Sequence, residues 1–145
     1  MQRFFPLFLP LLVSGGPLLL SGFPAFAQDP PAETFQPGPW QPQARVNPEM
    51  PIQVRLVNFT GLAMEYGLTS MVEPSQQLAA DGVALFNVVN LPDFLTINTL
   101  ERAALRYELQ PQEDRNLLEV NIRRIDDVMG DRTIQFDDTG AIYVY

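Results

Sequence analysis

Residues 118–123 read LEVNIR, and this stretch decides the fold class. Its leucine, valine and isoleucine alternate with polar residues, which places the apolar side chains on one face of an extended strand and the polar ones on the other. The same apolar residues, taken with Ile125 and Met129, also have near-helical spacing. A period of two fits them better, because the neighbouring segments have it too. The stretch therefore predicts a β-strand with one buried face.

The same alternation recurs throughout the chain after Pro51. It is found in residues 52–56, 62–69, 105–109, 134–136 and 141–145. Residues 83–89, which read VALFNVV, are apolar on both faces, and this is typical of a central strand. The segments together predict an all-β domain. We expect an antiparallel β-sandwich of roughly seven to nine short strands, with Ig-like Greek-key or meander connections.

Three short motifs predict hairpin turns between these strands. Asn58–Gly61 and Asp137–Gly140 each begin with a residue that opens a type I turn and end with a glycine suited to the left-handed region. Asp81-Gly82 is a third hairpin signal. Residues 74–80 are compatible with one short helical turn.

Residues 1–27 have the pattern of a secretory signal peptide. Arg3 precedes an apolar stretch that prolines and glycines interrupt, and the segment ends in Ala25-Phe26-Ala27, the small-x-small pattern of a cleavage site. We expect cleavage between Ala27 and Gln28. The alternative is a retained anchor, which needs about 20 uninterrupted apolar residues. Cleavage predicts an exported protein, periplasmic or secreted, without a stable membrane anchor.

Residues 28–51 form a second, proline-rich segment. Its prolines are Pro30, Pro31, Pro37, Pro39, Pro42, Pro48 and Pro51. Because proline removes a backbone donor and restricts φ, we expect a disordered or extended arm here, followed by a single domain over residues 52–145. Trp40 lies inside the arm. It is either a contact to the domain surface or part of a recognition segment.

The composition excludes several kinds of chemistry. The chain has 145 residues and a formal net charge of −8, and it contains arginine but no lysine, histidine or cysteine. It can therefore form no disulfide, Cys/His metal site, thiol nucleophile, histidine general base or lysine Schiff base. Its negative charge repels nucleic acid. We expect no cofactor, no nucleic-acid partner and no enzymatic activity.

Three stretches carry a resemblance to a group of proteins. They are Val54–Gly61, the Leu91-Pro92 step before Phe94–Ile97, and the ending Thr139–Val144. In these the chain resembles uncharacterised small exported β-sandwich proteins of cyanobacterial type, over roughly residues 52–145. The resemblance implies a signal peptide followed by a β-domain, and it implies no activity.

The acidic turns are candidate calcium ligands, because calcium takes oxygen ligands. Counting strands in strict alternation places the turn with Asp137 and Asp138 at the same end of the sandwich as Asp93 and Asp114. These four aspartates are the candidate ligands. The competing explanation is that aspartate is present because it opens turns.

Tyr143 and Tyr145 share one face of the last predicted strand. With Trp40 they are the candidate ligand-contact residues, because aromatic rings on a sandwich face can stack on sugars. They can equally pack against a neighbouring strand.

Asp138-Thr139-Gly140 also has the letters of the catalytic loop of dimeric aspartic proteases, where two aspartates share a proton. Only five residues follow it in this sequence, so a hairpin turn explains it better. The sequence thus predicts a non-enzymatic exported accessory or interaction domain that contacts a protein or envelope component. A calcium- or glycan-binding module is the alternative, and an aspartic-type protease is the remote one.

Overall fold

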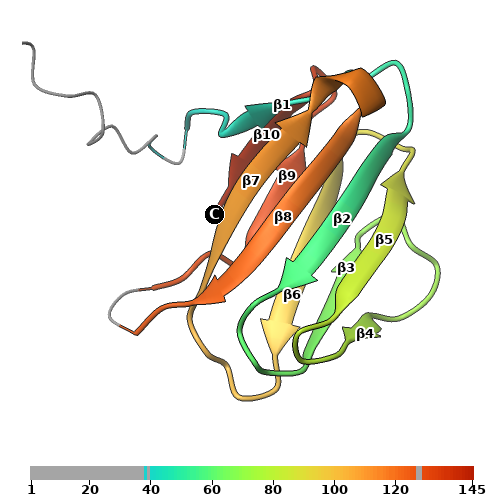
Figure 1. Cartoon of the computed structure of the whole chain (residues 1–145). Coiled ribbons are helices and arrows are strands. Elements are labelled where there is room, and N and C mark those ends of the chain that lie inside the picture. The colour runs from blue at the N-terminus through green and yellow to red at the C-terminus, as the bar shows by residue number, and fades with distance from the viewer. Residues whose placement is uncertain (1–37, 39, 127–128) are drawn as a thin grey trace, which may run out of the picture. The chain divides into compact units, whose positions relative to one another are not determined.

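The strands form two sheets that face each other (Figure 1). The computed structural model describes residues 38, 40–126 and 129–145. One sheet has the strand order β1 (Ala44–Arg45), β10 (Ala141–Val144), β9 (Thr133–Phe136), β6 (Asp93–Thr99), β3 (Met64–Leu68) and β4 (Gln76–Leu78). The other has the order β5 (Val83–Val88), β2 (Ile52–Asn58), β8 (Leu117–Arg124) and β7 (Leu105–Gln112). The 3-10 turn η2 (Glu113–Arg115) joins β7 to β8.

The predicted all-β sandwich is confirmed, with two differences in detail. The described residues contain ten strands, more than the number expected, because β1 and β4 are too short to show an alternation. One pair of neighbours, β2 and β8, is parallel. The two strands lie far apart in the sequence, so no tight turn forces them to run in opposite directions.

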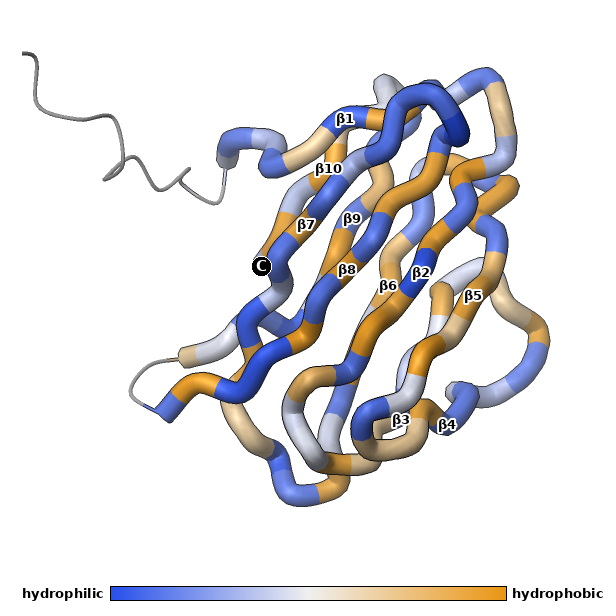
Figure 2. The backbone as a smooth tube through the Cα atoms, in the orientation of Figure 1, coloured by the Kyte–Doolittle hydropathy of each residue, from blue (hydrophilic) through white to orange (hydrophobic). Residues whose placement is uncertain are grey.

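The core lies between the two sheets and is built by the alternation in the sequence. In β8 the side chains of Leu118, Val120 and Ile122 are fully buried, and in β2 those of Ile52 and Leu56 are. Figure 2 shows this as a succession of hydrophobic and hydrophilic segments along both strands. Burying a side chain of this size stabilises the fold by about 1.5–3 kcal/mol.

Two of the three predicted hairpins are wrong. Asn58–Gly61 leads from β2 into β3, and Asp81-Gly82 leads from β4 into β5, so each turn carries the chain from one sheet to the other. Asp137–Gly140 does join a hairpin, β9 to β10, with Gly140 N–H donating to the Asp137 carbonyl at 3.0 Å. A turn motif predicts a change of chain direction, but not the sheet in which the next strand pairs.

Residues 83–89 do not form a central strand. Among the described residues β5 pairs with β2 alone and lies at the edge of the four-stranded sheet. The possible helical turn over residues 74–80 is wrong as well, because Gln76–Leu78 form β4 and pair with β3. Apolar residues on both faces of a strand therefore do not show here that both faces are buried.

The folded unit begins before Ile52, inside the segment expected to be an arm. β1 pairs with β10, and Val46 N–H donates to the Gly140 carbonyl at 2.9 Å. Asn47 N–H also donates to the Asn116 Oδ1 atom at 2.7 Å. The expected boundary at Ile52 is therefore too late. The predicted signal peptide, its cleavage site at Ala27 and Gln28, and the arm up to residue 37 lie outside the described residues.

Candidate functional site

Asp93 lies beside the β9–β10 turn, as strand counting predicted. Its carboxylate, however, bonds Ser70 and Phe94. Asp93 is paired in register with Phe136. It is buried, and it accepts hydrogen bonds from Ser70 N–H at 3.1 Å, from Phe94 N–H at 2.8 Å and from the Ser70 hydroxyl. The two Ser70 donors hold the loop after β3 against the start of β6. Asp93 therefore stabilises a loop.

Of the other candidate calcium ligands, Asp137 and Asp114 have partners close in sequence. Asp137 accepts from Thr139 Oγ1 at 2.6 Å and from Thr139 N–H at 3.2 Å. The Thr139 hydroxyl is the main cause of the lowered pKa of the Asp137 carboxyl. Asp114 lies 3.8 Å from the Arg115 guanidinium, and Asp138 is exposed at the turn. In residues 38, 40–126 and 129–145 no three acidic side chains come together as a metal site.

The Asp138-Thr139-Gly140 stretch forms the tip of the β9–β10 hairpin. Gly140 has a φ of 79°, the left-handed conformation that the turn requires. The carboxylate of Asp137 accepts both Thr139 donors and closes the turn. The stretch thus has the hairpin geometry that its residues predict.

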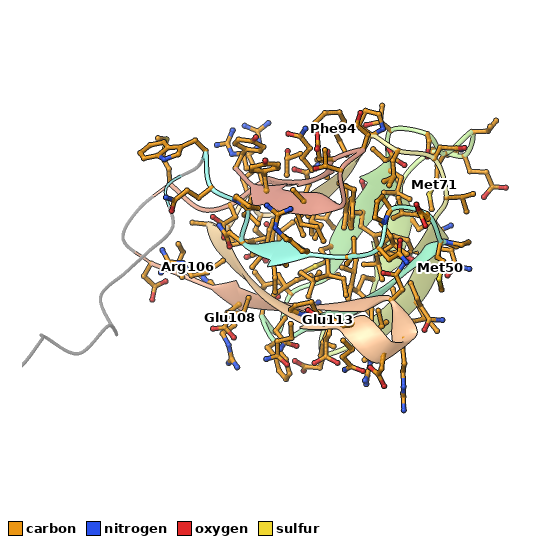
Figure 3. All side chains as sticks on the ribbon, turned by 90° about the horizontal axis from the view of Figure 1, so that it is seen from above. Met50, Met71, Phe94, Arg106, Glu108 and Glu113 are labelled. Carbon is orange, nitrogen blue, oxygen red and sulfur yellow. The ribbon has the colours of Figure 1, made fainter. Side chains whose placement is uncertain are left out.

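The two tyrosine candidates lie on the outer face of the six-stranded sheet. Tyr143 is opposite Gln135 in register, and Gln135 is opposite Phe94. Tyr145 is 51% exposed, and its hydroxyl donates to Gln135 Oε1 at 3.0 Å. Figure 3 shows Phe94 on this face, and it shows Arg106 and Glu108 on the opposite side of the domain, on the four-stranded sheet. Tyr143, Gln135 and Phe94 thus form one row across three strands.

The sequence analysis did not single out Phe94, although its position in the alternation of β6 indicates that it faces outward. In β6 (DFLTINT) it is in phase with the polar Thr96 and Asn98, so it faces outward and is partly exposed. Trp40 is 76% exposed and lies just before β1, the neighbour of β10. Phe94 and both tyrosines therefore belong to the outer face of this sheet, and Trp40 is exposed on the segment that leads into β1.

A second surface, which the sequence placed in the core, is the free edge of β5. Val83 is 53% exposed and Leu85 is 60% exposed, and Val89 just after the strand is exposed too. Figure 2 shows β5 as a largely hydrophobic strand at the border of its sheet. Ala84 and Phe86 face inward but stay half-buried, with the Phe86 ring stacked on Tyr66 at 5.3 Å between centroids.

The backbone of this edge has unpaired groups at alternate residues. Asn58 N–H donates to the Gly82 carbonyl at 3.0 Å, which sets the phase of the β2–β5 ladder. Since bonded residues alternate in an antiparallel pair, the N–H and C=O groups of Val83, Leu85 and Asn87 point away from β2. No other strand of the described chain pairs with them.

The outer face beside this edge carries ion pairs. Arg55 lies 3.3 Å from Glu119, and Arg123 lies 3.2 Å from Glu108 while its guanidinium is 5.0 Å from the centre of the Phe59 ring. These pairs are solvent-exposed, so each contributes at most about 1 kcal/mol.

A cleft of about 550 Å³ opens where the β6–β7 connection meets the segment before β9. Arg102 and Arg132 line it, with Leu100 and Met129 among its apolar residues. Asp131 lies there too, but its Oδ2 atom accepts from Tyr107 N–H at 2.8 Å. The cleft is therefore lined by two arginines together with apolar residues.

Comparisons with protein-family models, with curated proteins and with solved structures give no match to this chain. Within the part of the chain that the structure describes, no helix has the length and hydropathy needed to cross a membrane.

Proposed function

We propose that this chain is a non-enzymatic exported interaction domain that binds a protein partner by adding a strand to the edge of β5. The observation that carries the proposal is the combination of free backbone groups and exposed aliphatic side chains on one strand. Backbone groups of an edge strand supply affinity for an extended peptide, and alternate side chains supply specificity.

This strand lacks the features that normally protect a sheet edge, and their absence supports the proposal. Soluble proteins commonly place a charge, a proline or a bulge on an exposed edge, because a flat apolar edge recruits other strands. Residues 83–89 contain no charged residue and no proline, and β5 pairs with β2 over six consecutive residues. An edge of this kind suits a strand that pairs with a partner.

The proposal is tested with a soluble heptapeptide of alternating threonine and valine, titrated into the isotope-labelled full chain. We expect the amide signals of Val83, Leu85 and Asn87 to shift and their hydrogen exchange to slow, because their N–H groups would bond the peptide. A peptide with prolines at the alternate positions that face β5 is the control and should leave the signals unchanged. Binding at β7, the opposite edge, or no binding to the monomeric chain would contradict the proposal.

A second candidate function, glycan binding, rests on the row of aromatic residues on the six-stranded sheet. Tyr143 and Phe94 are two strand spacings apart, about 10 Å, and Gln135 lies between them with side-chain donors and acceptors. We expect Tyr143→Ala to abolish binding of a β-linked oligosaccharide measured by calorimetry. Phe59→Ala, which removes an aromatic ring from the other outer face, should leave it unchanged. A panel of oligosaccharides that gives no heat with the unmodified chain would exclude this function.

A further inference from the structure

We infer that the strand that adds to β5 is β5 of a second copy of this chain, so that two domains join their four-stranded sheets edge to edge. The inference rests on the proposed function and names its partner. It follows from three properties of the strand: its register, its charge and its half-covered inner face.

The free backbone groups are self-complementary about Leu85. If two β5 strands run antiparallel with Leu85 opposite its own copy, Val83 of each is opposite Asn87 of the other. All three residues whose backbone groups point outward then form bonded pairs, and each pair exchanges two hydrogen bonds. Shifting the register by two residues leaves one of the three without a partner in the strand. The centred register is therefore the one in which all the outward-pointing backbone groups of β5 have hydrogen-bond partners.

The charge of the chain favours this edge over other surfaces for self-association. Two copies, each with a formal charge of −8, repel each other over most approaches. β5 carries no charged residue, and in the centred register the nearest acidic residue, Asp81, is opposite Val89 of the other copy. Two copies can pair here without placing like charges opposite each other.

The inner face of the strand gains cover from the same pairing. Ala84 and Phe86 are half-buried because β5 is the last strand of its sheet. A continuing sheet places further inward side chains beside them. The contact involves little more than one short strand from each copy, and interfaces this small are weak and reversible.

The test is analytical ultracentrifugation of the full chain over a range of concentrations. We expect a reversible monomer–dimer equilibrium. Leu85→Lys should weaken it at least about ten-fold, because two introduced ammonium groups face each other across the twofold axis. Leu85→Glu should do the same. An equimolar mixture of the two variants should form the dimer again, because opposite charges then meet. Val72→Lys, at a fully exposed site in the β3–β4 connection, is the control.

Leu85→Pro separates the backbone contribution from that of the side chain. Its N–H points away from β2, so proline removes a donor to the second copy while leaving the β2–β5 bonds in place. We expect a monomer with an unchanged thermal transition.

The outcomes distinguish the two proposals. A dimer that all three Leu85 variants leave intact would show that another surface mediates association and would overturn the inference. A chain that stays monomeric yet binds the threonine–valine peptide at β5 would overturn the second copy as partner and keep the proposed function. A monomeric chain that binds no peptide would overturn both.

Discussion

The buried Asn58 side chain stabilises the connection in which the chain crosses from one sheet to the other. It is 1% exposed, and its amide donates to the Leu62 carbonyl at 2.7 Å and to the Ala79 carbonyl at 2.9 Å. Its Oδ1 atom accepts from Thr60 N–H at 3.0 Å and from Thr60 Oγ1 at 2.7 Å. One side chain thus ties the crossover after β2 to the segment before β5, and all four of its bonding positions are filled.

Asn58→Ala is expected to lower the free energy of unfolding by about 3 kcal/mol, because it removes four hydrogen bonds made by a buried side chain. Urea denaturation measures this as a lower midpoint at unchanged slope. Asn98→Ala, at an exposed asparagine in β6, should change stability by no more than about 0.5 kcal/mol. Equal losses in the two variants would contradict the role given to Asn58.

Tyr107 is a second buried residue with a measurable signature, the pH dependence of stability. Burial, and to a lesser degree the charge of Asp131, raise the pKa of the Tyr107 phenol above its usual value. The fold therefore favours the protonated phenol. Its contribution is fully present below about pH 10, the pKa of an unfolded tyrosine, and is lost as the pH rises above that value.

Tyr107→Phe should therefore flatten the loss of stability above about pH 10. At neutral pH it should cost no more than about 1 kcal/mol, since the hydroxyl makes one long bond to the Ile97 carbonyl at 3.4 Å. Part of the alkaline loss should remain, because burial also raises the pKa of Tyr66. Denaturant midpoints recorded across the alkaline range test this, with Tyr145→Phe as the exposed control. Parallel pH profiles for Tyr107→Phe and the unmodified chain would refute it.

At the scale of elements, two turn glycines with the same backbone conformation differ in their surroundings. Gly61 has a φ of 72° and Gly140 a φ of 79°. A Cβ atom at Gly61 would meet nothing within 4 Å, whereas one at Gly140 would collide with the Val46 carbonyl oxygen. The β9–β10 turn therefore needs glycine both for its φ and for the close approach of the segment after β1.

Gly61→Ala should cost about 1–2 kcal/mol for the left-handed conformation alone. Gly140→Ala should cost more, about 3–4 kcal/mol, because β1 must also move away from β10. Thermal denaturation compares the two variants. Hydrogen exchange of Val46 N–H, which bonds the Gly140 carbonyl, should accelerate only in Gly140→Ala. The prediction fails if the two variants lose the same stability and Val46 stays protected.

At the scale of the whole molecule, residues before Ile52 close one border of the sandwich. Ala44 is buried against the core, and Gln43 N–H donates to the Ile142 carbonyl at 2.8 Å. Asn116 Nδ2 also donates to the Asn47 carbonyl at 3.0 Å. These contacts join the segment to both sheets, because β10 belongs to one and Asn116 precedes β8 of the other.

A fragment of residues 52–145 is therefore expected to be less stable than one of residues 38–145 by about 2–4 kcal/mol, through lost burial and hydrogen bonds. Chemical denaturation of both fragments measures the difference. Met50→Ala in the longer fragment removes an exposed side chain from the same segment, and it should change little. Equal midpoints for the two fragments would show that β1 contributes nothing.

The two surfaces of interest differ in how far the sequence predicted them. The period of two in a strand predicted that Tyr143 and Tyr145 share one face, and in the structure Tyr143 is half-buried and Tyr145 exposed. Leu85 was assigned to a buried strand, and it is exposed. A strand with this hydropathy can lie at the edge or at the centre of a sheet, so hydropathy does not distinguish the two positions.

The sequence by itself determined the class of the fold, the inward residues of β2, β8 and β10, and the turn at Asp137–Gly140. Each of these depends on side-chain periodicity or on turn chemistry within a few residues. The tertiary structure alone decided which sheet each strand joins, the parallel pairing of β2 with β8, and the position of β5 at an edge. These depend on contacts between segments far apart in the chain, and a local pattern carries no information about which distant strand supplies the neighbouring hydrogen bonds.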